Sequence, residues 1–171
     1  LGTTNSIVSS SANTDPTVSQ VFIEPSPADT KAQLNCTINV TDPDIETDLS
    51  ANVSWYNLTA GSYVIFNSTV LNLTNSLLNS SLLNPSGIQA RGESWNCTAI
   101  PNDGSVLGSP NSTALTIVNN VSYIGNVTIR PDPAYTNDTL NCTGYAYDYD
   151  LDTMTLTFEW WNRTTPVYFS S

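Results

Sequence analysis

The strongest constraint on this fold is a repeat, which appears when the sequence is aligned with itself. Eleven positions recur at a constant offset of 106 residues without a gap. Both copies contain a proline-rich segment, then Leu-Asn-Cys-Thr, an acidic loop and a tryptophan, so the chain contains a tandem repeat. The matched positions are Pro25 and Pro131, Pro27 and Pro133, Ala28 and Ala134, Thr30 and Thr136, Leu34 and Leu140, Asn35 and Asn141, Cys36 and Cys142, Thr37 and Thr143, Asp42 and Asp148, Asp44 and Asp150, and Trp55 and Trp161.

The repeat predicts the domain boundaries. Leu1-Gly2 aligns with Leu107-Gly108 at the same offset, so residues 1–17 are expected to be the terminal strand of a preceding repeat, or a donor strand. Residues 18–120 then form one complete domain, and residues 121–171 form the N-terminal half of a second. The half domain would be completed either by further residues of a longer repeat array, which we favour, or by a neighbouring chain.

Apolar residues occur in short alternating runs separated by Pro, Gly and Asn-Asp, which is typical of half-buried strands joined by turns. Side chains of a strand point alternately to its two faces, so one face of each run is expected inside and the other outside. An Asp103-Gly104 turn is expected to lead into the last strand. The residues expected to point inward are Leu34, Cys36, Ile38, Val40, Val53, Trp55, Trp95, Cys97, Ala99, Leu115 and Ile117, and those expected to point outward include Gln33, Asn35, Thr37, Asn39, Thr41, Asn52, Ser54, Asn96 and Thr98.

The order Cys36, Trp55, Cys97, with Trp95 two residues before the second cysteine, resembles an immunoglobulin-like domain. The resemblance implies an all-β chain of immunoglobulin-like β-sandwich domains in tandem. It also implies a Cys36–Cys97 disulfide packed against Trp55, which would stabilise the fold by ~3–4 kcal/mol. Trp95 replaces the usual corner tyrosine, so its indole N–H needs a different partner.

Two further segments resemble the tandem immunoglobulin-like repeats of large prokaryotic, especially archaeal, cell-surface or filament glycoproteins. They are Gly92–Thr98 and Pro101–Gly104. This resemblance implies a fold and an extracellular or cell-surface location, and it implies no particular ligand.

Fourteen of the twenty asparagines begin an Asn-x-Ser/Thr triplet, or sequon, with x not proline. From the Ser and Thr content alone, chance would give roughly five. The excess predicts N-glycosylation at several sites, although Asn and Thr are also common in turns and on polar strand faces. The predicted sites are Asn35, Asn39, Asn52, Asn57, Asn67, Asn72, Asn79, Asn96, Asn111, Asn120, Asn126, Asn137, Asn141 and Asn162.

Alternating carboxylates follow the first cysteine strand of each copy. Such spacing can bring carboxylates together on a hard cation, and calcium is the extracellular candidate. The alternative, which the composition favours, is a solvated acidic turn. The candidate ligands are Asp42, Asp44, Glu46 and Asp48 in the first copy and Asp148, Asp150 and Asp152 in the second.

Charge and residue types exclude several functions. The net charge of −11 disfavours nucleic acid and anionic membranes as partners. The chain contains no histidine, which removes the commonest general base, and its cysteines are expected to be oxidised, so we expect no enzyme activity and no required cofactor. No segment has the length of a membrane span. Tyr145, Tyr147 and Tyr149 alternate and are interpreted either as a sugar-binding platform or as ordinary strand packing.

These features predict a structural segment of a heavily N-glycosylated extracellular filament or cell-surface fibre. Its partners would be copies of itself, joined head to tail. Cys142 would bond to a cysteine outside this chain or in another subunit. The alternatives are the stalk of an adhesin or receptor that binds a carbohydrate or protein, and a surface-layer protein.

Overall fold

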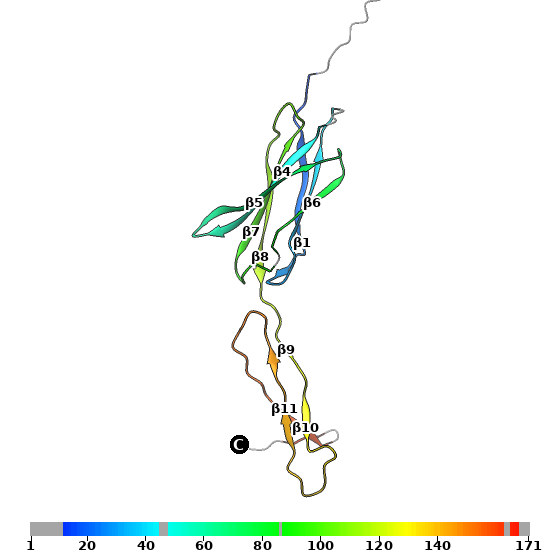
Figure 1. Ribbon diagram of the computed structural model, residues 1–171, viewed down its shortest axis with the longest axis vertical. Helices are drawn as coiled ribbons and strands as arrows, with labels where there is room; N and C mark the ends of the chain where they lie inside the picture. The colour runs from blue at the N-terminus through cyan, green and yellow to red at the C-terminus, as the bar shows by residue number, and fades with distance from the viewer. Residues whose placement is uncertain (1–11, 45–47, 86, 163–164, 168–171) are drawn as a thin grey trace, which may run out of the picture. The chain divides into compact units, whose positions relative to one another are not determined.

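A computed structural model describes residues 12–44, 48–85, 87–162 and 165–167 of the chain. Every regular element among these residues is a β-strand, as Figure 1 shows, which confirms the predicted all-β class. Contacts divide the chain into two compact units, Leu1–Val118 and Asn119–Ser171, which are described separately below. Most of the strand expected within residues 1–17 lies outside the described residues.

The first unit contains two sheets. In one, β1, β3 and β6 lie in that order with antiparallel pairing; in the other, the order is β2-β8-β7-β4-β5, with β2 parallel to β8 and the remaining pairs antiparallel. This pair of sheets is compatible with a β-sandwich. The strands are β1 (Thr17–Glu24), β2 (Ala28–Asp29), β3 (Asn35–Thr41), β4 (Ser50–Thr59), β5 (Ser62–Asn72), β6 (Leu78–Leu82), β7 (Ser94–Asn102) and β8 (Asn111–Val118).

The core of the first unit lies between these sheets and consists of the alternating residues that the sequence pattern places inside. The Cys36–Cys97 disulfide connects β3 to β7 and so joins the two sheets. Trp55 is 1% exposed and belongs to the same core cluster. Except for Leu115, which is half-buried and packed against the core, every residue expected to point inward is buried.

Two residues that the sequence pattern predicts to point outward into solvent are buried instead. Thr37 and Ser54 are only 8% and 6% exposed. Thr37 lies on the central strand β3, where neighbours on both β1 and β6 cover the outer face. Ser54 Oγ lies 2.9 Å from Ser68 Oγ on β5, so a cross-strand hydrogen bond closes over it. A period-two pattern assigns a face, but it does not report how far neighbouring strands cover that face.

The Asp103-Gly104 turn also differs from a simple hairpin. Gly104 has a φ of +87°, as a turn glycine does, and an isolated bridge from Asn102 to Leu107 closes this turn. β8 begins only at Asn111, so the connection continues beyond the turn before the last strand starts.

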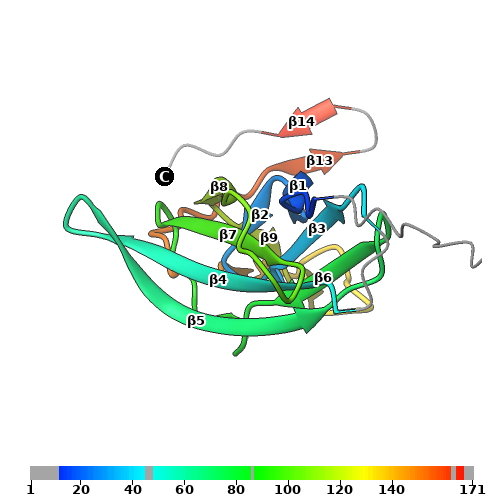
Figure 2. The same ribbon diagram turned by 90° about the horizontal axis from the view of Figure 1, so that it is seen from above.

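The β4–β5 hairpin extends away from the rest of the first unit (Figures 1 and 2). β5 is the edge of its sheet and pairs only with β4. It contains no charged residue, and its large apolar side chains are open to solvent: Val64 is 53% exposed, Ile65 57% and Val70 66%. An uncharged, apolar edge strand is a surface on which other strands can pair.

The second unit contains short antiparallel pairs whose register repeats that of the first unit. Ile129 pairs with Cys142 as Ile23 pairs with Cys36, an offset of 106 for both residues. The pairing of β9 with β12 likewise repeats the start of the β1–β3 pair. The strands are β9 (Tyr123–Ile124), β10 (Thr128–Arg130), β11 (Asn141–Thr143), β12 (Ala146–Tyr147), β13 (Trp160–Asn162) and β14 (Thr165–Val167).

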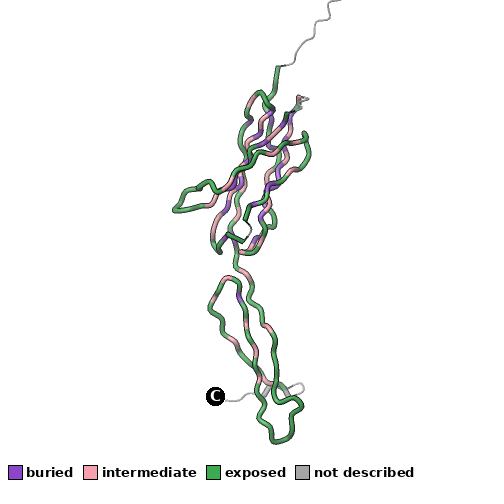
Figure 3. The backbone as a smooth tube through the Cα atoms, viewed as in Figure 1, coloured by how far each residue is buried: buried purple, intermediate pink, exposed green. Residues whose placement is uncertain are grey.

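The two units differ most in burial. Ile129 is 48% exposed, whereas its counterpart Ile23 is 6% exposed, and Leu140 is 44% exposed, whereas Leu34 is 0% exposed. Figure 3 shows this contrast as buried segments concentrated in the first unit. The second unit therefore has the strand register of the first unit without its closed core.

Candidate glycosylation surface and acidic turns

The sequon asparagines lie at the surface. The side chain of Asn162 is outside the described residues; of the other thirteen asparagines, six are exposed, seven are half-buried and none is buried. The exposed side chains are those of Asn52, Asn72, Asn111, Asn126, Asn137 and Asn141, and the half-buried ones are those of Asn35, Asn39, Asn57, Asn67, Asn79, Asn96 and Asn120.

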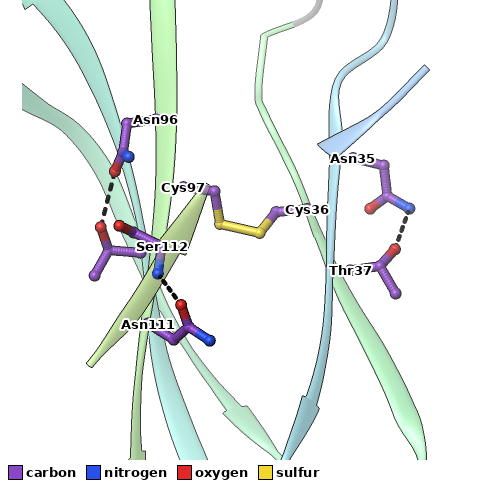
Figure 4. Close-up of a disulfide and its surroundings, with 8 residues drawn as sticks. Asn35, Cys36, Thr37, Asn96, Cys97, Asn111 and Ser112 are labelled. Atoms are coloured by element: carbon purple, nitrogen blue, oxygen red, sulfur yellow. Dashed lines mark hydrogen bonds between the residues drawn. A yellow bond between two sulfur atoms is a disulfide. The ribbon is translucent and has the colours of Figure 1, made fainter. Parts of the chain in front are cut away.

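Sequons next to the disulfide show how strand alternation produces this arrangement. In Figure 4, Asn35 and Asn96 point away from the Cys36–Cys97 bond that separates them. The Thr98 hydroxyl donates to Asn96 Oδ1 at 2.8 Å, so the two polar residues of this sequon contact each other on the outer face. The cysteine between them points into the core.

The acidic turns bind backbone N–H groups. In the first unit, the N–H of Asp44 donates to Asp42 Oδ1 at 2.8 Å. In the second unit, the N–H of Asp150 donates to Asp148 Oδ1, also at 2.8 Å. Asp42 and Asp148 are 6% and 5% exposed, so the first carboxylate of each turn is buried rather than solvated, contrary to the favoured solvated-turn interpretation.

The second carboxylate of each turn accepts a hydrogen bond from the backbone just before the first strand of its unit, which we call the entry segment. The N–H of Thr14 donates to Asp44 Oδ2 at 2.6 Å, three residues before β1. The N–H of Asn120 donates to Asp150 Oδ2 at 2.6 Å, three residues before β9. We call this bond the entry contact. It recurs at the repeat offset for both of its residues.

The calcium site stays a prediction. Within the described residues no group of three or more acidic, histidine or cysteine side chains is arranged to hold a metal ion. Asp42 Oδ2 is buried and has no hydrogen-bond partner among the described residues, whereas Glu46, one of the predicted ligands, lies outside them. Among the described residues, Asp42 and Asp148 accept the turn bonds, and Asp44 and Asp150 accept the entry contacts.

A further buried aspartate, Asp103, belongs to the predicted Asp103-Gly104 turn and makes contacts beyond that turn. It is 2% exposed, and its carboxylate accepts from Asn13 Nδ2 at 2.7 Å and from the N–H groups of Ser105 and Val106, each at 2.7 Å. The Asn13 bond, followed by the Val106 bond, holds the pKa of Asp103 below its ordinary value. The Asp-Gly pair is the sequence signal for this turn.

The indole N–H of Trp95 has a hydrogen-bond partner in Glu93, two residues earlier in the chain. This N–H donates to Glu93 Oε2 at 3.1 Å, and the same oxygen accepts from the N–H of Ala90 at 2.9 Å. The ring of Phe66 meets Trp95 edge-on, with 5.3 Å between centroids. Glu93 thus anchors the Trp95 indole beside the core.

Cys142 is a free thiol of intermediate exposure. Its pairing with Ile129 places it at the register position that Cys36 occupies in the first unit. A hollow of about 620 Å³ on the second unit includes Ile124 and Ala146 in its lining. These two residues correspond to the buried Val18 and Val40 of the first unit, so this hollow lies on the side that is core in the first unit.

No protein-family model, curated protein or solved structure matches this chain. Among the described residues no helix has the length and apolarity needed to cross a bilayer.

Proposed function

We propose that this chain is a structural segment of a heavily N-glycosylated extracellular fibre made of tandem immunoglobulin-like repeats. The observation that carries the proposal is the recurrence of strand register and entry contact at an offset of 106 residues. Stacked copies of one supersecondary unit are the usual construction of extended repeat proteins.

The surface supports the glycoprotein part of the proposal. All thirteen sequon asparagines whose side chains are described lie at least partly in solvent. The sandwich itself is closed by a disulfide, which forms and persists in oxidising compartments such as the extracellular space. Glycans on several strands would leave little bare protein, so subunit contacts would run head to tail between copies.

The strand order of the first unit supports the immunoglobulin-like assignment. β3 and β7 carry the bridged cysteines on opposite sheets, and Trp55 lies on β4 beside β7. This arrangement follows the family pattern, in which the bridge connects strands B and F and a tryptophan of strand C belongs to the same core.

The register position of Cys142 indicates how the second unit would be completed. In the first unit, the strand that carries Cys97 supplies the other half of the bridge. We expect a segment equivalent to β7, from a longer array or from another subunit, to cover the second unit and bond to Cys142. A separately produced peptide that carries such a strand should form a mixed disulfide with this chain and not with its Cys142→Ser variant.

The proposal is tested on native material by denaturing, non-reducing electrophoresis before and after chemical deglycosylation. We expect a large species that shrinks on deglycosylation and that forms fibres under the electron microscope. A native protein whose mass does not change on deglycosylation would exclude the glycoprotein assignment. Dispersed monomers in the micrographs would exclude the fibre.

A further inference from the structure

Tyrosines cluster on the solvent face of the second unit. Centroid separations are 4.7 Å between Tyr147 and Tyr149, 5.3 Å between Tyr123 and Tyr147, and 6.2 Å between Tyr123 and Tyr149. Exposed fractions of these rings are 41–48%. Tyr123 pairs with Tyr147, whereas the next pair, Ile124 with Ala146, faces the opposite side, which is core in the first unit. Tyr147 therefore lies away from the core face, and the rings of Tyr123 and Tyr149 contact its ring; Tyr123 also borders the hollow of the second unit.

The positions of the first unit that correspond to the four tyrosines hold no aromatic residue: they are Thr17, Asn39, Thr41 and Pro43. Thr17 and Thr41 occupy the positions of Tyr123 and Tyr147, and their hydroxyls lie 3.0 Å apart. Ser19 donates to the carbonyl oxygen of Asn39 at 3.1 Å. One strand register thus carries small polar side chains in the first copy and tyrosines in the second.

A glycine makes room for a fourth tyrosine. Gly125 stands where the first unit has Ser19, and Tyr145 stands where it has Asn39. A Cβ at Gly125 would meet ring atoms of Tyr145 at 2.3 Å, so the ring occupies the space of the missing side chain. The Gly125 N–H donates to the Tyr145 carbonyl at 2.7 Å, which holds the two strands together there. The change from Ser to Gly at position 125 thus makes room for the change from Asn to Tyr at position 145.

The sequon changes strand between the two units. In the first unit, Gln20 pairs with Asn39, and Asn39 begins a sequon. At the repeat offset these positions are Asn126, which begins a sequon, and Tyr145, which is 57% exposed. The asparagine predicted to be glycosylated has moved to the other of the two segments. Asn126 follows Gly125, whose N–H donates to the Tyr145 carbonyl, so the first sugar on Asn126 is within reach of the Tyr145 ring.

We propose that the tyrosine face of the second unit is the binding surface for the N-glycan attached to Asn126 of the same chain. The first sugar stacks on the Tyr145 ring, and the following sugars lie over Tyr123, Tyr147 and Tyr149. A pyranose ring presents apolar C–H groups on its face and hydroxyls at its edge, which matches the apolar rings and polar hydroxyls of tyrosine. The inference rests on the proposed N-glycosylation of the chain.

The test uses the full chain produced in a glycosylating host with labelled tyrosine rings. We expect upfield ring-current shifts for C–H protons of the Asn126 glycan and contacts from them to the Tyr145 ring. We also expect the Tyr145→Asn/Gly125→Ser variant, which restores the first-unit residues, to lose both signals. Endoglycosidase should release the Asn126 glycan roughly two- to tenfold faster from this variant, the factor that a stacking contribution of one aromatic ring implies.

Two controls separate the proposal from simpler explanations. Tyr135→Ser removes a tyrosine of the same unit that is 77% exposed and outside the cluster, and it should leave the release rate unchanged. The glycan at Asn111 in the first unit should show neither ring shift nor a change in release. Equal release from the wild type and the double variant would overturn the proposal, and so would a ring shift that disappears on dilution, because the occupant would then belong to a second copy.

Site-resolved mass spectrometry distinguishes failure of this inference from failure of the proposed function. Glycans at other sequons together with an empty Asn126 would sink the inference alone. A chain without glycans at any sequon when isolated from its native source would sink both.

Discussion

At the scale of single residues, buried carboxylates have the clearest structural role. Asp103 closes its own turn and also holds Asn13 of the entry segment. Because these bonds lower its pKa in the folded state, its contribution to stability is complete above the unfolded value of about 3.9 and is lost as the pH falls through the folded value.

We therefore expect Asp103→Asn to lower the free energy of unfolding at pH 7 and to lower it less as the pH falls below about 4. Urea unfolding of both proteins between pH 2 and 7 measures this difference. Glu24→Gln, at an exposed position on β1, is the matched control and should show a smaller difference at pH 7. If the difference in free energy of unfolding between the wild type and Asp103→Asn instead grew as the pH fell, the lowered pKa of Asp103 would be contradicted.

A second residue-scale prediction concerns Gly108. A Cβ at this position would lie 1.9 Å from the Pro16 carbonyl oxygen and 2.9 Å from a side-chain atom of Pro101. Gly108→Ala must therefore displace the backbone of the entry segment, and we expect destabilisation by about 1–3 kcal/mol, in the range of overpacked sites. Thermal unfolding measures it. Gly144→Ala is the control for the loss of a glycine without a clash, because Gly144 has no positive φ and the atom nearest to its added Cβ is 3.4 Å away.

At the scale of strands and sheets, the disulfide stabilises the folded first unit, whereas the exposed edge strand β5 favours its self-association. The Cys36–Cys97 bridge closes a separation of 61 residues. We expect Cys36→Ala/Cys97→Ala to lose about 4 kcal/mol of stability by the chain-entropy estimate. Chemical denaturation measures this loss. Cys142→Ala, which breaks no bridge in this chain, should leave the unfolding midpoint of the first unit unchanged.

The β5 edge predicts self-association once glycans are removed. Ile65 is 57% exposed on an edge strand without charges, so Ile65→Lys should reduce aggregation of the deglycosylated chain with little change in unfolding midpoint. Light scattering at several concentrations measures the aggregation. Leu107→Lys adds the same charge at a position that is 64% exposed and outside β5, so an equal effect would show that net charge, and not the edge, is responsible.

The sequence predicted these elements unevenly. Alternation identified Leu34, Ile38 and Trp55 as core residues, because a strand whose inner face is buried fixes the period of its apolar residues. It missed the burial of Thr37, which depends on strands distant in sequence. It also missed the entry contacts, because a hydrogen bond between residues 30 positions apart leaves no periodic signal. The alternation of Tyr145, Tyr147 and Tyr149 is apparent in the sequence, but only the strand register places Tyr147 on the side opposite to Ala146.

At the scale of the whole molecule, the core is concentrated in one unit. The core cluster extends from Val18 to Ile117, within the first unit. We expect a protein of residues 12–118 to fold alone and to unfold at the temperature of the main calorimetric transition of the full chain. A large fall in that temperature would show that the second unit contributes to the stability of the first.

The entry contact has an evolutionary consequence. Both partners of each contact lie in one compact unit, Thr14 with Asp44 and Asn120 with Asp150, and the second pair is the first moved by 106 residues. A gene duplication that copies one period therefore copies the complete contact, and no compensating mutation is needed at the new boundary. Lineages could lengthen or shorten such a protein by unequal recombination, while selection acts separately on the outward residues of each copy, as the exchange of Thr17 for Tyr123 illustrates.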